Sequence, residues 1–398
     1  MNKFLIVINA GSSSIKFAVY QLDFSLQLNI DANGQIEGIG NQPNFTVNSY
    51  LGEAIVDCPL SVTEVSNHMA AINIIYAWLL KYMADGTLLA VGHRVVHGGQ
   101  NYLAPVLVNT AVLKDLETLI PLAPLHQPHN LAAIQAFHEF IPLLPQVACF
   151  DTAFHCTQPD VAQRFALPRH FFDEGIRRYG FHGLSYEYVT TMLPTLDPKL
   201  ENARIIIAHL GNGASLCATH EGRSVATTMG FSPLDGLVMG TRCGNLDPAV
   251  LLYLMEHHNM DERALEHLLY YGSGLLGVSG ISNDMRILIA SDDPNAKQAI
   301  ELFVYRIGRE IGSLAAALGG LDALIFTGGI GEHSSVIRAK ICQQVAWLGL
   351  DVDLSANETA ATCLSTPQSK ISAWVVATDE NLMIARHTLN FLNKKMLH

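Results

Sequence analysis

Residues 205–219 read IIIAHLGNGASLCAT, a short apolar run that stops at a turn with two glycines and then resumes as a second run. The first run is too short for a buried helix and is rich in isoleucine, so the pattern predicts a strand, a tight turn and another strand. Gly211 and Gly213 lack a Cβ atom, which permits positive φ angles and close approach of backbone N–H groups to an anion. The stretch fits a phosphate-binding hairpin, with an ordinary glycine-turn hairpin as the alternative.

A second stretch with the same plan opens the chain. A buried-strand pattern ends at Ala10, a polar turn begins with Gly11, and an alternating strand that carries Lys16 follows. The two hairpins lie about half a chain length apart. We therefore predict an internal duplication at the level of structure.

The length and composition indicate a two-domain α/β enzyme. A chain of 398 residues exceeds what one hydrophobic core usually holds. A hydrophobic fraction of 49% with a charged fraction of 15% is typical of a well-packed enzyme. We expect domains at residues 1–150 and 151–382, with the terminal helix at about 383–398 as a candidate to pack on the first domain.

The net charge limits the classes of binding partner, and the cysteine pattern indicates the cellular compartment. A net charge of −12 argues against nucleic acid and against an anionic membrane surface, since both select a basic face. The seven cysteines contain no C-x-x-C pair, which favours reduced thiols. No signal peptide and no run of membrane-spanning length is recognisable, so we expect a cytoplasmic protein.

Glycine loops follow three predicted buried strands, at Gly11, at Gly211 and Gly213, and at Gly329 and Gly331. Three such loops exceed what turns alone require. Their polar neighbours could hold phosphate or a hydrated Mg²⁺, and these are Asn9, Asn212 and Glu332. Lys16 could reach a phosphate, although an exposed strand lysine is the alternative.

Charged and titratable side chains beside glycines are the candidates for chemistry. Arg94 and Arg242 stand in glycine-rich loops, where a guanidinium group can bind carboxylate or phosphate through two hydrogen bonds; structural salt bridges are the alternative. His182 could donate to a developing charge or bond its own loop. Asp151 could orient an arginine or a metal-bound water, or cap a turn. Glu380 could bind Mg²⁺, or it could be an acidic residue in the first turn of the last helix that interacts favourably with the helix dipole.

Seven motifs together carry a family resemblance over essentially the whole chain. In order they are NAGSSSIK (9–16), GHRVVHGG (92–99), FDTAFH (150–155), RRYGFHG (177–183), HLGNG (209–213), GTR (240–242) with DP (247–248), and FTGGIGE (326–332). In order and spacing they resemble the acetate kinase family. The resemblance implies the acetate and sugar kinase, Hsp70 and actin superfamily fold, with two RNase H-like (actin-like ATPase) domains, an interdomain nucleotide cleft and a homodimer.

The resemblance also implies a role for each site residue. Arg94 would hold the acetate carboxylate, Arg242 and His182 would stabilise the transferring phosphoryl group, and Asp151 would be the catalytic acidic residue. Asn9 and Glu380 would place Mg²⁺, or Mn²⁺ in its stead. The residues implied to bind ATP or ADP are Ser12, Lys16, His209, Leu210, Gly211, Asn212, Gly213, Asp284, Met285, Arg286, Gly329, Ile330, Gly331, Glu332 and His333.

Three positions depart from the usual pattern of the family. Asp379 and His333 stand where the family usually has Asn, and Ala226 stands where it usually has Asp. The first departure concerns the geometry around Glu380, and the other two concern nucleotide affinity and loop support.

The expected activity is reversible phosphoryl transfer from ATP to acetate, giving acetyl phosphate and ADP. A propionate kinase on the same scaffold is the nearest alternative, and Val96 is the candidate wall residue that limits acid length. An actin- or Hsp70-like nucleotide switch would have no use for Arg94, Arg242 and His182, which argue against it.

Overall fold

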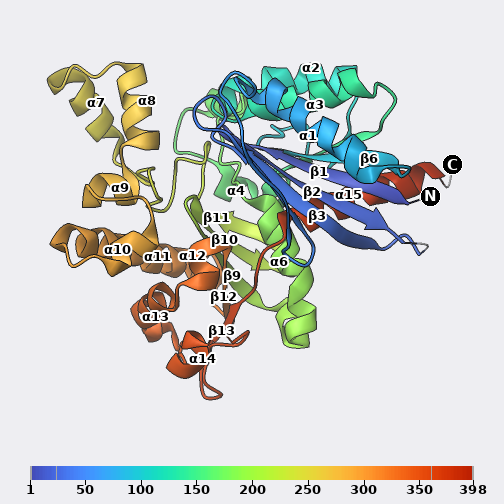
Figure 1. The fold of residues 1–398 in the computed structure, drawn as a ribbon. Coiled ribbons are helices and arrows are strands. Elements are labelled where there is room, and N and C mark those ends of the chain that lie inside the picture. The colour runs from blue at the N-terminus through green and yellow to red at the C-terminus, as the bar shows by residue number, and fades with distance from the viewer. Residues whose placement is uncertain (1, 24, 360, 397–398) are drawn as a thin grey trace. The chain divides into compact units, whose positions relative to one another are not determined.

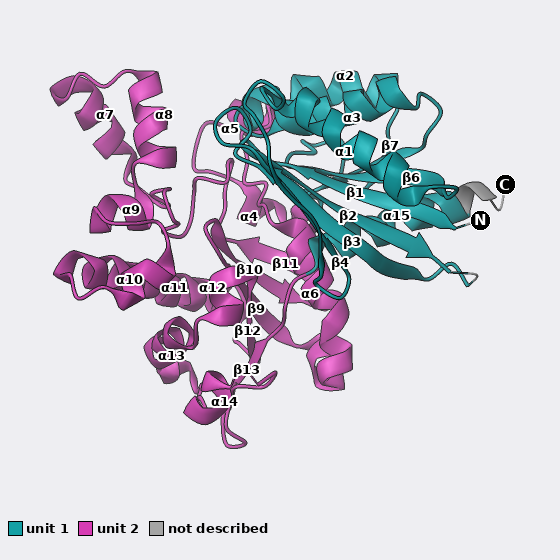
Figure 2. Ribbon diagram, in the orientation of Figure 1, with its two compact units in different colours: residues 1–153, 379–398 teal, residues 154–378 magenta. Residues whose placement is uncertain are grey.

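The computed structural model describes residues 2–23, 25–359 and 361–396 (Figure 1). The chain forms two compact units, one of residues 1–153 with 379–398 and one of residues 154–378 (Figure 2). The boundaries expected from sequence lie after residues 150 and 382, so Asp151 and Glu380, expected in the second domain, fall in the first of these units. The two units are called unit 1 and unit 2 below, and each is described by itself.

Unit 1 is built on a sheet with the strand order β5-β4-β3-β2-β1-β6-β8-β7. β1 pairs antiparallel with β2 and parallel with β6, and β6 pairs parallel with β8. The carboxyl ends of β1, β6 and β8 therefore meet at one edge of the sheet. The elements of unit 1 are β1 (Lys3–Ala10), β2 (Ser14–Leu22), β3 (Leu28–Glu37), β4 (Asn44–Ser49), β5 (Ala54–Pro59), α1 (His68–Met83), β6 (Thr87–Val95), β7 (Val106–Leu107), α2 (Thr110–Thr118), α3 (Gln127–Phe140), β8 (Gln146–Phe150) and α15 (Glu380–Met396).

Apolar side chains that alternate along β1 and β2 form the core of unit 1 together with α1 and α3. Ile8, Phe17, Ile72 and Phe137 all belong to this buried cluster. The terminal helix α15 packs against β6 at Gly92, where a Cβ atom would lie 2.6 Å from Cγ2 of Ile384. Glycine is thus required for this close approach of strand and helix.

Unit 2 is built on a five-stranded sheet with the order β11-β10-β9-β12-β13. β9, β10 and β11 are antiparallel neighbours, whereas β12 pairs parallel with both β9 and β13. The strands β3-β2-β1-β6-β8 of unit 1 repeat this order and these directions. The duplication predicted from the two hairpins is therefore confirmed at the level of topology.

The helices of unit 2 follow their sequence signals closely. α11 (Pro294–Leu318) begins after the N-cap Asp293 and ends at Gly319, which has a φ of 69°. Its apolar stripe, which includes Phe303 and Ile311, is buried. The other elements are α4 (Asp160–Gln163), α5 (Arg169–Asp173), α6 (Gly183–Leu196), β9 (Arg204–Leu210), β10 (Ala214–His220), β11 (Arg223–Thr227), α7 (Pro248–His257), α8 (Glu262–Tyr271), α9 (Gly274–Ser279), α10 (Met285–Ala290), β12 (Ala323–Thr327), α12 (Gly328–His333), α13 (Ser335–Gln344), α14 (Leu354–Glu358) and β13 (Ser372–Val375).

Candidate active site

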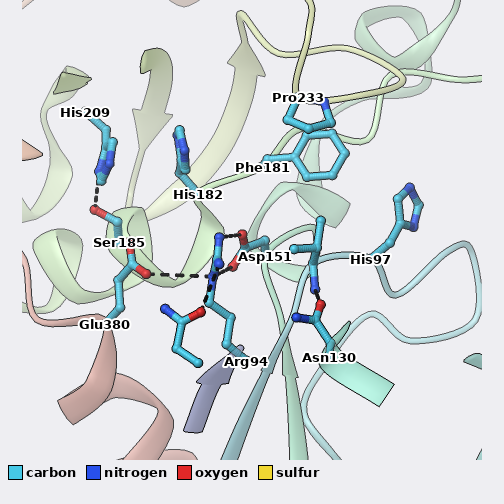
Figure 3. A network of polar contacts seen from close by, with 12 residues as sticks. Arg94, His97, Asn130, Asp151, Phe181, His182, Ser185, His209, Pro233 and Glu380 are labelled. Atoms are coloured by element: carbon cyan, nitrogen blue, oxygen red, sulfur yellow. Dashed lines mark hydrogen bonds and ion pairs between the residues drawn. The ribbon is translucent and has the colours of Figure 1, made fainter. Parts of the chain in front are cut away.

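Four polar side chains of unit 1 converge where β1, β6 and β8 end (Figure 3). Arg94 near the end of β6 forms a two-bond pair with Asp151, with Nε to Oδ1 at 3.0 Å and Nη2 to Oδ2 at 2.5 Å. Arg94 Nη1 also donates to Oδ1 of Asn9 at 3.2 Å. Glu380, the first residue of α15, lies 3.8 Å from Arg94 Nε. The parallel strand order brings these residues together from positions far apart in the sequence.

The electrostatics of this group keep Arg94 charged. Burial alone would lower the pKa of Arg94, but the carboxylates of Asp151 and Glu380 raise it further than burial lowers it. Asp151 is 1% exposed, so its carboxylate depends on the guanidinium group for compensation. The guanidinium group of Arg94 is therefore a cation whose orientation is fixed by the buried carboxylate of Asp151. Such a group can bind a small carboxylate or a phosphate.

Two buried amides that the sequence analysis did not identify position the segment after β6. Asn130 Oδ1 accepts from the N–H of Val96 at 2.9 Å, and its Nδ2 donates to the carbonyl of Ala10 at 2.7 Å. Gln127 Oε1 accepts from the N–H of His97 at 3.2 Å. Both amides stand at the start of α3, where polar residues in a buried turn were the one available signal. Asn130 ties the end of β1 to the segment after β6, and Gln127 holds that segment at His97.

In unit 2 the glycine turn between β9 and β10 lies against two of the predicted catalytic groups. A Cβ atom on Gly213 would lie 3.3 Å from Nε2 of His182 and 3.7 Å from Nη1 of Arg242. Gly211 and Gly213 are not among the glycines with positive φ, so the expectation from their conformational freedom is wrong. At Gly213, the absence of a Cβ atom instead allows His182 to pack closely against the turn.

His182 and Arg242 are held by neighbours within unit 2. His182 has a φ of 59°, and its Nδ1 lies 2.9 Å from Oγ of Ser215 on β10. Its ring stacks on His209 with centroids 4.3 Å apart (Figure 3). Arg242 Nη1 donates to the carbonyl of Pro233 at 3.1 Å. Two side-chain nitrogen donors therefore lie at the same glycine turn, which suits stabilisation of a transferring phosphoryl group.

A cavity of about 780 Å³ adjoins the same turn. It brings together most of the residues expected to bind the nucleotide, and its lining includes Gly211, Asn212, Asp284, Met285, Arg286, Gly329, Ile330 and His333. Asp284 pairs with Arg286 at 2.6 Å, and this hydrogen bonding lowers the pKa of Asp284 to about 2. The volume is ample for a nucleoside and part of its phosphate chain.

The remaining expected nucleotide residues lie elsewhere in their units. Glu332 Oε1 accepts from the N–H groups of Gly328 at 2.8 Å and Thr378 at 3.2 Å, which makes it a support of the α12 turn. Leu210 is fully buried within β9, and the buried Gly331 lies in α12. In unit 1, Ser12 and Lys16 are exposed on the first hairpin.

Known proteins and a family model match nearly the whole chain. Residues 4–386 match the model of the Acetokinase family. The chain belongs to the acetokinase family. It is 54% identical over 391 residues to an acetate kinase of Rhodopseudomonas palustris, covering 97% of this chain and 98% of that one. It also resembles the crystal structure of Porphyromonas gingivalis acetate kinase, at 37% identity and a TM-score of 0.87 over 98% and 100% of the two chains.

Membership in this family confirms two expectations from the sequence. The chain has the fold with two actin-like α/β domains, and it is an ATP-dependent kinase. A propionate kinase from Francisella tularensis subsp. tularensis SCHU S4 is also structurally similar, with a TM-score of 0.90 and 36% identity over 98% of this chain and 99% of that one. Among the described residues, no helix is both long and apolar enough to cross a membrane.

The residues that depart from the usual family pattern have clear local settings. Asp379 Oδ1 accepts from the N–H of Leu382 at 2.8 Å, so it supports the first turn of α15, which begins at Glu380. His333 is exposed in the lining of the large cavity. Ala226 lines a second cavity of about 320 Å³.

Proposed function

We propose that the protein transfers the terminal phosphoryl group of ATP to the carboxylate of acetate. The bond from phosphorus to the β,γ-bridging oxygen breaks, a bond to an acetate oxygen forms, and ADP leaves. A carboxylic acid with a pKa near 5 is already ionised at neutral pH, so no general base is needed. The demand is for positioning and for neutralisation of charge on the transferring group.

The observation that carries this proposal is the placement of His182 Nε2 and Arg242 Nη1 against the Gly213 turn. These donors are assigned to the transferring phosphoryl group, and Arg94 of unit 1 is assigned to the carboxylate of the acid. Asp151 orients Arg94 through its two-bond pair and has no proton to remove. A sugar kinase would instead use an Asp as a base toward a hydroxyl group.

Mg²⁺ is the metal that we propose to accompany ATP, with Mn²⁺ able to replace it. Among the described residues, no group of three His, Cys, Asp or Glu side chains forms a metal cage. This fits Mg²⁺, which keeps several waters and binds through one or two protein oxygens and the phosphates. Asn9 and Glu380 supply such oxygens beside Arg94. When bound, the ion would neutralise phosphate charge.

The test is formation of acyl phosphate, trapped as the hydroxamate, from ATP and acetate. Product should depend on acetate, on ATP and on Mg²⁺, and EDTA should abolish it. ATP hydrolysis that is indifferent to added acetate would contradict the proposal and favour a nucleotide switch.

Acid length is the open choice within this proposal, because both acetate and propionate kinases are structurally similar to this chain. We propose acetate, with buried Val96 limiting the space beyond the carboxylate. A lost or added methylene contact changes specificity by about 1–3 kcal/mol. The ratio of kcat/KM for acetate to that for propionate should exceed one and fall in Val96→Ala. A higher kcat/KM for propionate in the unmodified protein would favour the alternative.

We also propose that the protein is a cytoplasmic homodimer. Within the described residues none of the seven cysteines forms a disulfide, which supports a reducing compartment. Apolar side chains are exposed on α7, α8 and α10, and they include Leu252, Tyr253, Met255, Tyr271 and Ile287. A second copy of the chain would cover such a surface. Light scattering should give twice the chain mass, and Leu252→Asp should shift the protein toward the monomer.

A further inference from the structure

Behind His182, two buried hydroxyl groups form a chain of hydrogen bonds that ends on its ring. Tyr186 on α6 and Ser215 on β10 are both 0% exposed. Tyr186 OH contacts Ser215 Oγ in a short hydrogen bond, and Ser215 Oγ lies 2.9 Å from His182 Nδ1. These are the hydrogen bonds that the side chains of Tyr186 and Ser215 make within the described residues.

The hydrogens in this chain can be placed by counting donors and acceptors. Tyr186 OH has one hydrogen, and its acceptor within the described residues is Ser215 Oγ. If Tyr186 donates to Ser215, the serine hydroxyl is free to donate to His182 Nδ1. In the opposite direction Nδ1–H donates to Ser215 and Ser215 donates to Tyr186, which leaves the buried tyrosine hydrogen without an acceptor. A buried unsatisfied donor costs about 1–3 kcal/mol.

We propose that Tyr186 and Ser215 are positioning residues that fix the neutral tautomer of His182 with its hydrogen on Nε2. That nitrogen is the one against the Gly213 turn, so the relay presents an N–H donor to a phosphoryl group there. The inference about function rests on the proposed phosphoryl transfer, whereas the tautomer itself does not. In this proposal the hydroxyl groups of Tyr186 and Ser215, acting at Nδ1, determine that the ring is neutral and that Nε2 is the hydrogen-bond donor.

Charged and titratable groups around the ring agree with a neutral imidazole. His209 on β9 stacks on His182, and its own Nδ1 lies 2.8 Å from Oγ of the buried Ser185. Arg242 Nη1 lies at the same turn as His182 Nε2. A positive charge on His182 would be repelled by the Arg242 cation. A positive charge on His209 as well would increase this repulsion.

The first test is direct observation of the tautomer. Two-bond ¹H–¹⁵N correlation spectra of the full-length protein with labelled histidine should show a neutral His182 with its hydrogen on Nε2, assigned by the signal lost in His182→Asn. In Ser215→Ala, His182 should populate both tautomers or the imidazolium. A Nδ1–H or imidazolium pattern in the unmodified protein, or an unchanged pattern in Ser215→Ala, would overturn the proposal.

Kinetics of a double-mutant cycle separate the relay from simple structural support. Ser215→Ala should lower kcat at least about tenfold with the KM values for acid and ATP within about twofold, since tautomer control acts on the transition state. Tyr186→Phe should have a smaller effect, and that effect should vanish in the Ser215→Ala background because Tyr186 acts through Ser215. Fully additive losses in kcat would contradict the relay. If the spectra agree but His182→Asn turns over normally, the role of His182 in phosphoryl transfer fails while the tautomer assignment stands. If the unmodified protein forms no acetate-dependent product, the proposed function fails, again without touching the tautomer assignment.

Discussion

The two hairpins that open the two duplicated sheets share a topology but differ in what surrounds their turns. In β1–β2 the N–H of Gly11 donates to Ser14 O at 2.8 Å, and Ser12 and Ser13 are exposed. In β9–β10 the N–H of Gly211 donates to Gly213 O at 3.1 Å, and two side-chain donors pack against the turn. The first turn presents small hydroxyls to solvent, whereas the second is part of a packed polar network.

This difference suits the two hairpins to the different roles that we propose for them. The first turn is held from behind by His68, whose Nε2 lies 2.6 Å from Gly11 O, and the exposed Lys16 follows it on β2. The second turn is held beside groups whose own orientation is fixed, His182 by Ser215 and Arg242 by Pro233. Preorganised donors are what stabilise charge in a transition state, because no reorganisation is needed during reaction. We therefore propose that the first hairpin contributes to substrate binding and that the second hairpin contributes to transfer of the phosphoryl group.

The largest expected effect of a single substitution is at Arg242, which packs against the turn of the second hairpin. Arg242→Ala should lower kcat by roughly 10³–10⁵, the range known for an arginine that neutralises a transferring phosphoryl group. Arg242→Lys keeps the positive charge but loses the planar guanidinium group, so its kcat should lie between that of the unmodified protein and that of Arg242→Ala. The hydroxamate assay measures turnover, and circular dichroism monitors the fold. Near-normal turnover of a folded Arg242→Ala protein would break the contrast between the hairpins.

Arg94 on β6 tests the binding side of the contrast, since it contacts Asn9 of the first hairpin and is assigned to binding of the acid. Arg94→Ala should raise the KM for acetate by about 10- to 100-fold, in line with about 1.5–3 kcal/mol for a charged hydrogen bond. It also removes the cation that pairs with the buried carboxylate of Asp151, which lowers stability. Arg94→Ala with Asp151→Asn should recover stability but not the KM. A raised KM for ATP with an unchanged KM for acetate would reverse the assignment of the sites.

The glycines of the two turns form a matched pair. A Cβ atom at Gly213 would crowd His182 Nε2 at 3.3 Å, whereas one at Gly11 would meet Ser14 O at 3.4 Å. Gly213→Ala should lower kcat roughly tenfold by displacing a catalytic donor, and Gly11→Ala should lower it about threefold or less. Steady-state kinetics of the two variants give the comparison. Equal losses in kcat would mean that the second turn has no special relation to His182.

The hairpins and the arginines could be predicted because their signals are local. Short apolar runs that stop at glycine, and arginines beside glycines, need no knowledge of the tertiary fold. Asn130 could not be found this way, since it joins Ala10 and Val96, which are 120 and 34 residues away in the chain. The role of glycine at Gly213 was misjudged for a related reason. It depends on side chains that other segments bring to the turn, and backbone freedom alone does not reveal them.

The smallest expected effect concerns Lys16, and it sharpens the comparison from the side of the first hairpin. Lys16 pairs with Asn9 in the β1–β2 register and is exposed, so water and salt screen its charge. Lys16→Met should raise the KM for ATP about two- to fivefold at low salt, in line with the roughly 0.2–1 kcal/mol of an exposed ion pair, and the effect should shrink as salt is added. The kcat should stay unchanged, because the donors assigned to the transferring group lie against the turn of the second hairpin. A large loss of kcat that salt does not alter would place Lys16 among the transfer groups and remove the division between the two turns.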